Sequence, residues 1–269
     1  MRRWWIYLIG FAGLVVVVAP FAWMLFGSFK TDGELLRVPP TWLPEAPTIG
    51  NYSELLSKAN FPRYFLNSTV VALFVTAGNL TFCSMLGYAL AKLRFGGRNA
   101  LFVLVLATLM VPGMVTFVPL FVLVTNAGLQ NSYPGLILPF LVSPFGVFLM
   151  RQFFAGLPDD LMDAGRVDGT SELGIFVRIM LPLCRPALAT LGILTFLGSW
   201  NNFLWPLVIA QTEDKYTLPV ALALYSTGQN AQRYGLLMAG AVVVVVPVLL
   251  IYIAFQRHIT KGIAITGLK

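Results

Sequence analysis

A charged segment interrupts an otherwise apolar chain and holds the residue types best suited to chemistry or to partner binding. It runs from Leu157 to Pro186 and contains five of the eleven acidic residues, at Asp159, Asp160, Asp163, Asp168 and Glu172. Arg166, Arg178 and Arg185 lie among them. So many charges cannot lie in lipid, and their pattern is too regular for an unstructured connection. We interpret the charged segment as the functional surface of the protein, which the rest of the chain holds in place.

The charged segment is predicted to begin with a short helix. Pro158 is favourable at a helix N-terminus, and the helix would run to about Asp168. Gly169 would end it, because glycine accepts a left-handed conformation. Thr170 or Ser171 would then cap a second helix.

The second helix is predicted to be amphipathic. Its apolar face would consist of Leu173, Phe176, Val177 and Met180. In the first helix, Gly165 and Gly169 would leave one side bare, so that another surface could come close. The pattern favours docking of a cytoplasmic protein, and a solvated loop with incidental helices is the alternative.

Motifs for catalysis and ATP binding are absent from the sequence. There is no G-x-x-x-x-G-K-[ST] loop, no H-E-x-x-H and no G-x-S-x-G. Acids, histidine and basic residues are missing from the depths of the apolar runs, where a proton-coupled pump needs them. We therefore predict no catalytic site, no metal site and no cofactor bound by this chain. Any transport would be powered from outside it.

Uncharged polar residues inside the apolar runs form a second group of candidates. The group is Asn79, Trp200, Asn201, Asn202 and Trp205. An amide in lipid needs a partner, which is either another helix or a polar solute. Aromatic faces next to amides suit sugar rings, but tryptophan near a span end is also typical of interfacial anchoring. Both interpretations stay open from the sequence.

The composition predicts a membrane protein of helices. The chain has 269 residues, of which 58% are hydrophobic and 11% charged, with a mean hydropathy of +0.80. Long uncharged runs of about twenty residues each suffice to cross a bilayer as a helix. The first run is too long for a cleaved signal peptide. We predict an all-α polytopic protein with six spans, at about 4–28, 66–90, 100–124, 134–154, 187–210 and 235–256.

The basic residues predict the orientation of these spans. With six spans, one side of the membrane carries twice as many lysines and arginines as the other, and both termini lie on that richer side. The positive-inside rule therefore places both termini in the cytoplasm, together with the charged segment between spans four and five. The net charge of +7 does not gather on one polar face, so we predict a lipid bilayer and no nucleic acid as the partner.

A resemblance to a known family rests on the charged segment. Asp163–Thr170 reads D-A-G-R-V-D-G-T and is followed by Phe176, Ile179, Leu181-Pro182 and Pro186. This resembles the EAA loop of bacterial ABC importer permeases, E-A-A-x-x-D-G-A, with Asp163 in place of glutamate and Gly165 and Thr170 in place of alanines. The runs 199–207 (S-W-N-N-F-L-W-P-L) and 261–263 (K-G-I) extend the likeness. The similar subfamily takes up carbohydrates, like the smaller permease of maltose-type importers.

The resemblance implies a single permease domain over residues 1–269 in a bacterial inner membrane. It would form half of a pathway for a sugar or sugar derivative, beside a second homologous permease. Two ATP-binding subunits, using ATP and Mg²⁺, and an extracytoplasmic solute-binding protein would complete the complex. The segment 157–186 would be the coupling loop, with contacts to the ATPase from Asp160, Asp163, Ala164, Gly165, Asp168, Gly169, Phe176, Leu181 and Pro182.

Alternatives of other classes remain open at this point. The solute could be a glycerophosphate ester, an amino acid or a polyamine. A secondary transporter would need internal repeats and a site for a coupling ion, and neither is clear in the sequence. A membrane scaffold would explain the charged segment but not the polar residues inside the spans.

Overall fold

The computed structural model describes residues 4–57, 60–227 and 233–266. Within these ranges the regular structure is helical, with no β-strand, so the predicted all-α class is confirmed. The chain forms two compact units. The first consists of Met1–Leu66 and Thr217–Leu249, and the second of Asn67–Tyr216 and Leu250–Lys269.

The first unit combines the N-terminal helices with two helices from late in the chain. Its helices are α1 (Trp4–Gly27), α2 (Asp32–Leu35), α3 (Gly50–Ser57), the start of α4 (Phe61–Gly78), α15 (Leu218–Tyr225) and the start of α16 (Tyr234–Thr266). Small residues allow them to pack closely. A Cβ atom on Gly27 would lie 2.1 Å from Met238 Sδ, and one on Gly240 would lie 2.8 Å from Leu222.

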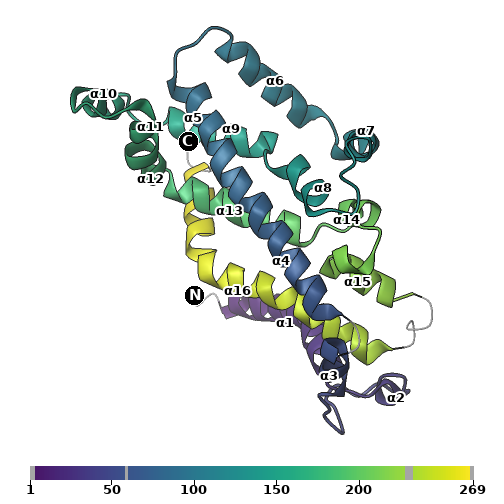
Figure 1. Ribbon diagram of the computed structural model, residues 1–269. Coiled ribbons are helices and arrows are strands. Elements are labelled where there is room, and N and C mark those ends of the chain that lie inside the picture. The colour runs from purple at the N-terminus through teal and green to yellow at the C-terminus, as the bar shows by residue number, and fades with distance from the viewer. Residues whose placement is uncertain (1–3, 58–59, 228–232, 267–269) are drawn as a thin grey trace. The chain divides into compact units, whose positions relative to one another are not determined.

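The second unit contains the charged segment and the polar candidates. Its elements are η1 (Asn79–Cys83), α5 (Ser84–Lys92), α6 (Arg98–Met110), α7 (Gly113–Asn126), α8 (Tyr133–Ile137), η2 (Leu138–Phe140), α9 (Pro144–Ala155), α10 (Asp160–Val167), α11 (Glu172–Gly174), η3 (Ile175–Met180), α12 (Leu181–Leu183), α13 (Arg185–Trp200), α14 (Leu204–Ile209) and η4 (Glu213–Lys215). Both η1 and η3 are π-helical, whereas η2 and η4 are 3₁₀ turns. Helices α5 and α9 lie side by side, with α10 to α12 at the same end (Figure 1).

Three helices in the described ranges are long and apolar enough to cross a membrane. They are Trp4–Gly27, Phe61–Lys92 and Tyr234–Ala254. The predicted cores 4–28, 66–90 and 235–256 fall within or very near them. The second of these is one continuous helix, because α4, η1 and α5 follow each other without a break.

The predicted cores 100–124, 134–154 and 187–210 are not single helices. The chain bends by 103° between α6 and α7 and by 42° between residues 133–140 and α9. It bends by 81° between residues 172–183 and α13. Proline explains the first break, since Pro112 lacks an N–H and holds Val111 in an extended conformation. The fifth core is interrupted after Trp200, where α13 ends and α14 begins at Leu204.

Candidate functional site

The charged segment folds as two short helices with the predicted turn between them. Helix α10 ends at Val167, and Gly169 adopts a left-handed φ of +74°. The N–H of Thr170 donates to the carbonyl of Gly165 at 2.9 Å, which closes the end of the helix. Ser171 caps the second helix by accepting a hydrogen bond from the N–H of Gly174 at 3.2 Å.

The apolar face predicted for the second helix is partly wrong. Phe176 and Met180 are buried as expected, but Leu173 is 66% exposed and Val177 48% exposed. The reason is the π-helical stretch η3, in which hydrogen bonds join residues five apart. In that wider turn Ile175 and Met180, five residues apart, are both fully buried.

The bare side predicted for the first helix is filled by the charged segment itself. A Cβ atom on Gly165 would lie 2.9 Å from Ile179 Cδ1 and 3.0 Å from Ile175 Cγ1. Gly165 therefore lets α10 pack directly on η3, and it is not open to an outside surface. At Gly169, by contrast, a Cβ atom would meet nothing within 4 Å.

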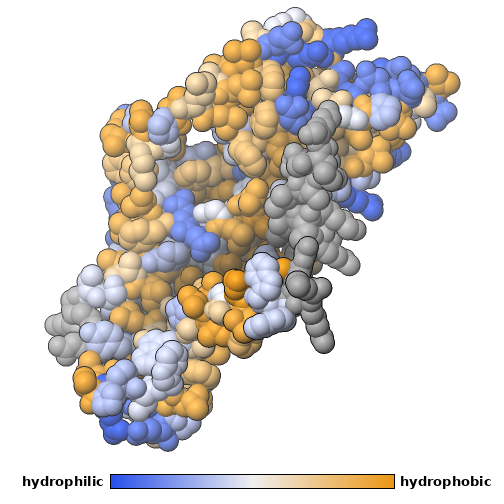
Figure 2. Space-filling model, turned by 180° about the vertical axis from the view of Figure 1, so that it is seen from behind, coloured by the Kyte–Doolittle hydropathy of each residue, from blue (hydrophilic) through white to orange (hydrophobic). Residues whose placement is uncertain are grey.

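The residues predicted to contact an ATPase divide into an exposed group and a structural group. Gly165 and Phe176 are buried, and Leu181 and Pro182 are half-buried. The exposed group is Asp160, Asp163, Ala164, Asp168 and Gly169. Figure 2 shows hydrophilic residues gathered over α10 and over the segment between α5 and α6.

Two exposed apolar side chains join this group and were missed from the sequence. Val167 is 88% exposed at the end of α10, and Leu173 follows across the turn. The helical period assigned Leu173 to a buried face, and Val167 stood only as a spacer in the motif. Together with the exposed acids, they give the charged segment an apolar tip on a polar surface.

Arg166 holds the two helices of the charged segment together. Its guanidinium forms ion pairs with Glu172 at 2.7 Å and with Asp163 at 2.9 Å. The hydrogen bond that Arg166 donates to Glu172 is the main reason that the pKa of Arg166 is raised above its ordinary value. Asp163 is thus oriented by Arg166 while its side chain stays 67% exposed.

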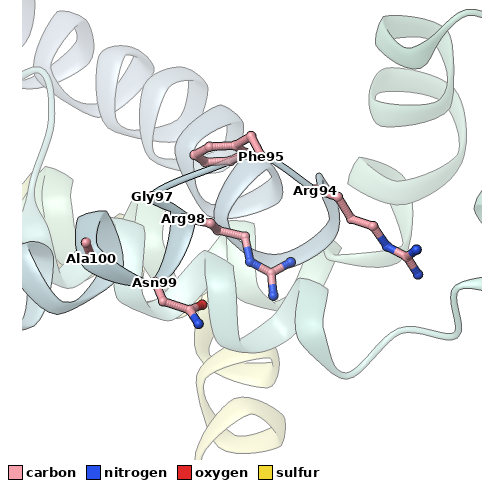
Figure 3. A pocket seen from close by; sticks show the side chains of 6 residues that line it. All are labelled: Arg94, Phe95, Gly97, Arg98, Asn99 and Ala100. Atoms are coloured by element: carbon pink, nitrogen blue, oxygen red, sulfur yellow. The ribbon is translucent and has the colours of Figure 1, made fainter.

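A basic segment lies between α5 and α6. Arg94, Phe95 and Gly97 to Ala100 line a pocket of about 430 Å³ there. Figure 3 shows Arg94 and Arg98 extending to one side of this segment, with the ring of Phe95 on the other. Arg98 donates to the carbonyl of Leu93 at 3.2 Å, which ties the start of α6 to the end of α5.

A cavity of about 540 Å³ lies among the polar candidates of the second unit. Its walls come from α4, η1, α7, α8, η2, α9, α13 and α14 and from the break before α9. No residue lining it in the described part of the chain carries a charge. Its polar lining consists of Asn79, Thr116, Ser143, Thr195, Ser199 and Asn202.

The structure brings three of the five predicted pathway residues to this cavity. Asn79, Asn202 and Trp205 line it. Trp200 is instead buried against Phe196, with ring centroids 5.6 Å apart. Asn201 is exposed, and its amide donates to the carbonyl of Leu197 one turn back in α13. Trp200 and Asn201 are adjacent to the cavity in sequence but are not among its lining residues.

Thr116, Thr195 and Ser199 were not singled out as pathway residues. A lone hydroxyl in an apolar helix usually bonds its own backbone, so sequence alone gives it little weight. Thr116 does so, donating to the carbonyl of Gly113 at 3.0 Å. Only the fold shows that these hydroxyls share one cavity.

Asn79 joins the walls of the cavity. Its amide donates to the carbonyl of Phe140 at 2.6 Å, and its side-chain oxygen accepts from Ser143 Oγ at 2.6 Å. Ser143 in turn caps α9 through the N–H of Gly146 at 3.1 Å. The broken helix 133–155 is therefore fastened to η1 at the level of its break.

Trp205 forms part of the cavity wall and offers little aromatic surface for a sugar ring to stack on. Its indole N–H donates to the carbonyl of Gly135 at 3.1 Å, and its ring meets Phe117 and Phe140 edge-on. The side chain is buried, so its aromatic face is largely covered by protein.

Comparison with known proteins decides the family. Residues 83–265 match the family described as "Binding-protein-dependent transport system inner membrane component". The chain belongs to this family. It is thus the permease component of an ABC transporter, not an enzyme, and the matched region includes the charged segment and most of the cavity.

Named relatives match this permease over almost its whole length. The arabinooligosaccharides transport system permease protein AraQ of Halalkalibacterium halodurans is 42% identical, over 98% of this chain and 96% of the relative. The diacetylchitobiose uptake system permease protein NgcG of Streptomyces coelicolor is 39% identical, over 93% and 83%. The sn-glycerol-3-phosphate transport system permease protein UgpE of Salmonella typhi is 32% identical, over 93% and 92%.

A solved structure shares the fold of this permease. It is a chain of a bacterial ABC transporter involved in the import of the acidic polysaccharide alginate. The TM-score is 0.85 at 23% identity, over 96% of this chain and 98% of that one. The likeness supports the arrangement of bent and continuous helices described above.

Proposed function

We propose that this permease forms half of the transmembrane pathway of an ATP-driven importer for a neutral sugar or sugar derivative. The uncharged cavity is the observation that carries this proposal. Amides and hydroxyls can exchange hydrogen bonds with the hydroxyls of a sugar, and the apolar walls can meet its ring faces. The printed names of several relatives point to arabinooligosaccharides, diacetylchitobiose and lactose.

A glycerophosphate ester is the second candidate, because the permease UgpE of several bacteria is about one-third identical to this chain. A phosphate dianion in a buried site needs arginine, lysine or a helix N-terminus. The cavity lining includes no basic side chain in the described residues, and the N-terminus of α9, which reaches the cavity at Pro144, already has its Gly146 N–H capped by Ser143. The neutral sugar is therefore favoured.

The membrane arrangement belongs to the same proposal. Three continuous helices and three bent pairs are compatible with six spans. Both termini and the charged segment would then lie in the cytoplasm, as the basic residues suggest. The partners would be a second homologous permease, two ATPase subunits that use ATP and Mg²⁺, and an extracytoplasmic binding protein.

The charged segment would dock the ATPase through its exposed residues. Val167 and Leu173 supply an apolar anchor, and Asp160, Asp163 and Asp168 supply a polar rim. Gly165 and Phe176 would contribute by keeping the segment rigid, not by touching the ATPase.

Uptake into vesicles tests the solute. The permease and its partner subunits would be reconstituted in vesicles with the ATPase subunits and ATP inside. Labelled arabinotriose, diacetylchitobiose, lactose and glycerol 3-phosphate would be offered outside, together with the binding protein. We expect ATP-dependent uptake of at least one sugar and none of glycerol 3-phosphate. Uptake of glycerol 3-phosphate alone would favour the second candidate. Uptake driven by an ion gradient without ATP would instead indicate a secondary transporter.

A further inference from the structure

Lys92 connects the end of α5 to the base of the charged segment. Its ammonium donates to the carbonyl of Leu157 at 2.5 Å and forms an ion pair with Asp159. The side chain of Lys92 is only 4% exposed, although Asp159 is 73% exposed. A nearly buried ammonium needs these partners, because an unpaired charge there would be costly. Lys92 is also favourably placed in the last turn of α5, near the negative end of the helix dipole.

The electrostatics of Asp159 agree with this contact. The hydrogen bond from Lys92 is the main reason that the pKa of Asp159 lies below its ordinary value. Arg94 lowers the pKa of Asp159 in the same direction through its charge. Lys92 therefore binds Asp159 directly, whereas Arg94 acts on it through the electric field.

Tyr88, one turn before Lys92, binds both helices of the charged segment. Its ring centroid lies 5.1 Å from that of Phe176 and 5.5 Å from that of Phe154 in α9. Its hydroxyl donates to Met162 Sδ at 4.0 Å. These buried side chains belong to one hydrophobic core. The cytoplasmic half of α5, the end of α9 and the charged segment are thus packed together.

The other end of the same helix reaches the cavity. Asn79 lies thirteen residues before Lys92, which is roughly 20 Å along a helix at about 1.5 Å per residue. The helix is continuous between them, through η1 and α5. A displacement imposed on the charged segment can therefore be carried along this helix to Asn79.

We propose that Lys92 is a positioning residue, which fixes the charged segment to α5 so that movement of α10 is transmitted through α5 to Asn79 and the cavity. This inference rests on the proposed function, because it requires a partner that moves α10. Without the ammonium, the carbonyl of Leu157 loses its donor and Asp159 its partner. The segment would then hinge at 157–159 and absorb the movement instead of transmitting it.

Hydrogen exchange of the purified permease tests the contact itself. Lys92→Met keeps the apolar stem and removes the charge, so the amides of 157–168 should exchange at least about tenfold faster than in the wild type. Lys92→Arg keeps a charged donor and should restore most of the protection. Arg94→Gln is the matched control, since it removes a cation near Asp159 and leaves the hydrogen bonds to Leu157 and Asp159 in place. Equal exchange in Lys92→Met and Arg94→Gln would overturn the proposal.

Transmission is tested by the ATP hydrolysed per sugar imported in the reconstituted complex, with a sugar that the wild type imports. We expect Lys92→Met to hydrolyse ATP and to import several-fold less sugar per ATP, and Lys92→Arg to approach the wild-type ratio. An unchanged ratio in Lys92→Met, with a wild type that couples normally, would overturn the role of Lys92 alone. A wild type that imports none of the sugars with ATP would overturn the proposed function, and the exchange experiment would still decide the contact.

Discussion

Asn79 is the polar side chain on which the cavity wall most depends. It is buried, and it joins η1 to Phe140 and Ser143 at the break before α9. Asn201 is the same residue type on an exposed position, bonded to its own helix. The two asparagines therefore allow a matched comparison within one protein.

Replacing each asparagine by leucine should separate these roles. Asn79→Leu removes the donor to Phe140 and the acceptor for Ser143, so we expect a loss of about 1–2 kcal/mol in stability. Asn201→Leu should change stability by less than about 0.5 kcal/mol. Thermal unfolding of the purified permease in detergent measures both. Equal effects of the two substitutions would contradict the role assigned to Asn79.

Helix α10 owes its position to the close approach at Gly165. There a Cβ atom would lie at 2.9 Å from Ile179 and 3.0 Å from Ile175. Gly165→Val should therefore push α10 away from η3 and cost roughly 1–3 kcal/mol.

Ala164→Val is the control at the neighbouring exposed position. It should cost less than about 0.7 kcal/mol, since only helix propensity changes. Protease cleavage within 157–171, compared between the two variants, follows the local loosening directly. Similar cleavage of both variants would show that α10 does not rest on η3.

The elements that sequence predicts well here are those set by local chemistry. Gly169 forms the left-handed turn and Ser171 caps the second helix. Both roles follow from the chemistry of the residue itself and of its near neighbours. The length of α1 follows from its apolar run. The turn, the cap and α1 follow from neighbouring residues alone.

The elements that sequence mispredicts depend on the fold. The π-helical stretch η3 exposes Val177 and buries Ile175, which packs against Gly165 of α10, and a period of 3.6 residues does not anticipate this. The cavity likewise gathers Thr116 and Ser199 from α7 and α13, which are far apart in sequence. The neighbours of Trp200 predict a pathway residue, but its ring stacks on Phe196 of its own helix.

At the scale of the whole molecule, the orientation in the membrane is a prediction that labelling can test. Cys83 and Cys184 are both buried, so the native thiols should react little with a membrane-impermeant maleimide. Asp168→Cys and Glu213→Cys would each place a thiol at an exposed position. In intact cells without an outer membrane, we expect Glu213→Cys to be labelled and Asp168→Cys to be protected until the cells are broken. The opposite pattern would invert the proposed topology.

The proposed docking of a separate ATPase on the charged segment can be tested at Val167. Val167→Asp places a charge on the most exposed part of its apolar tip, where the side chain is 88% exposed and takes little part in packing. Leu43→Asp makes the same kind of change at a 63% exposed leucine between α2 and α3, outside the charged segment.

The deciding measurement is the amount of ATPase subunit that co-purifies with the tagged permease from membranes. Val167→Asp should retain about tenfold less ATPase than the wild type, as expected for loss of an apolar anchor at an interface, whereas Leu43→Asp should retain the wild-type amount. Equal recovery of the ATPase with both variants would contradict docking through the charged segment.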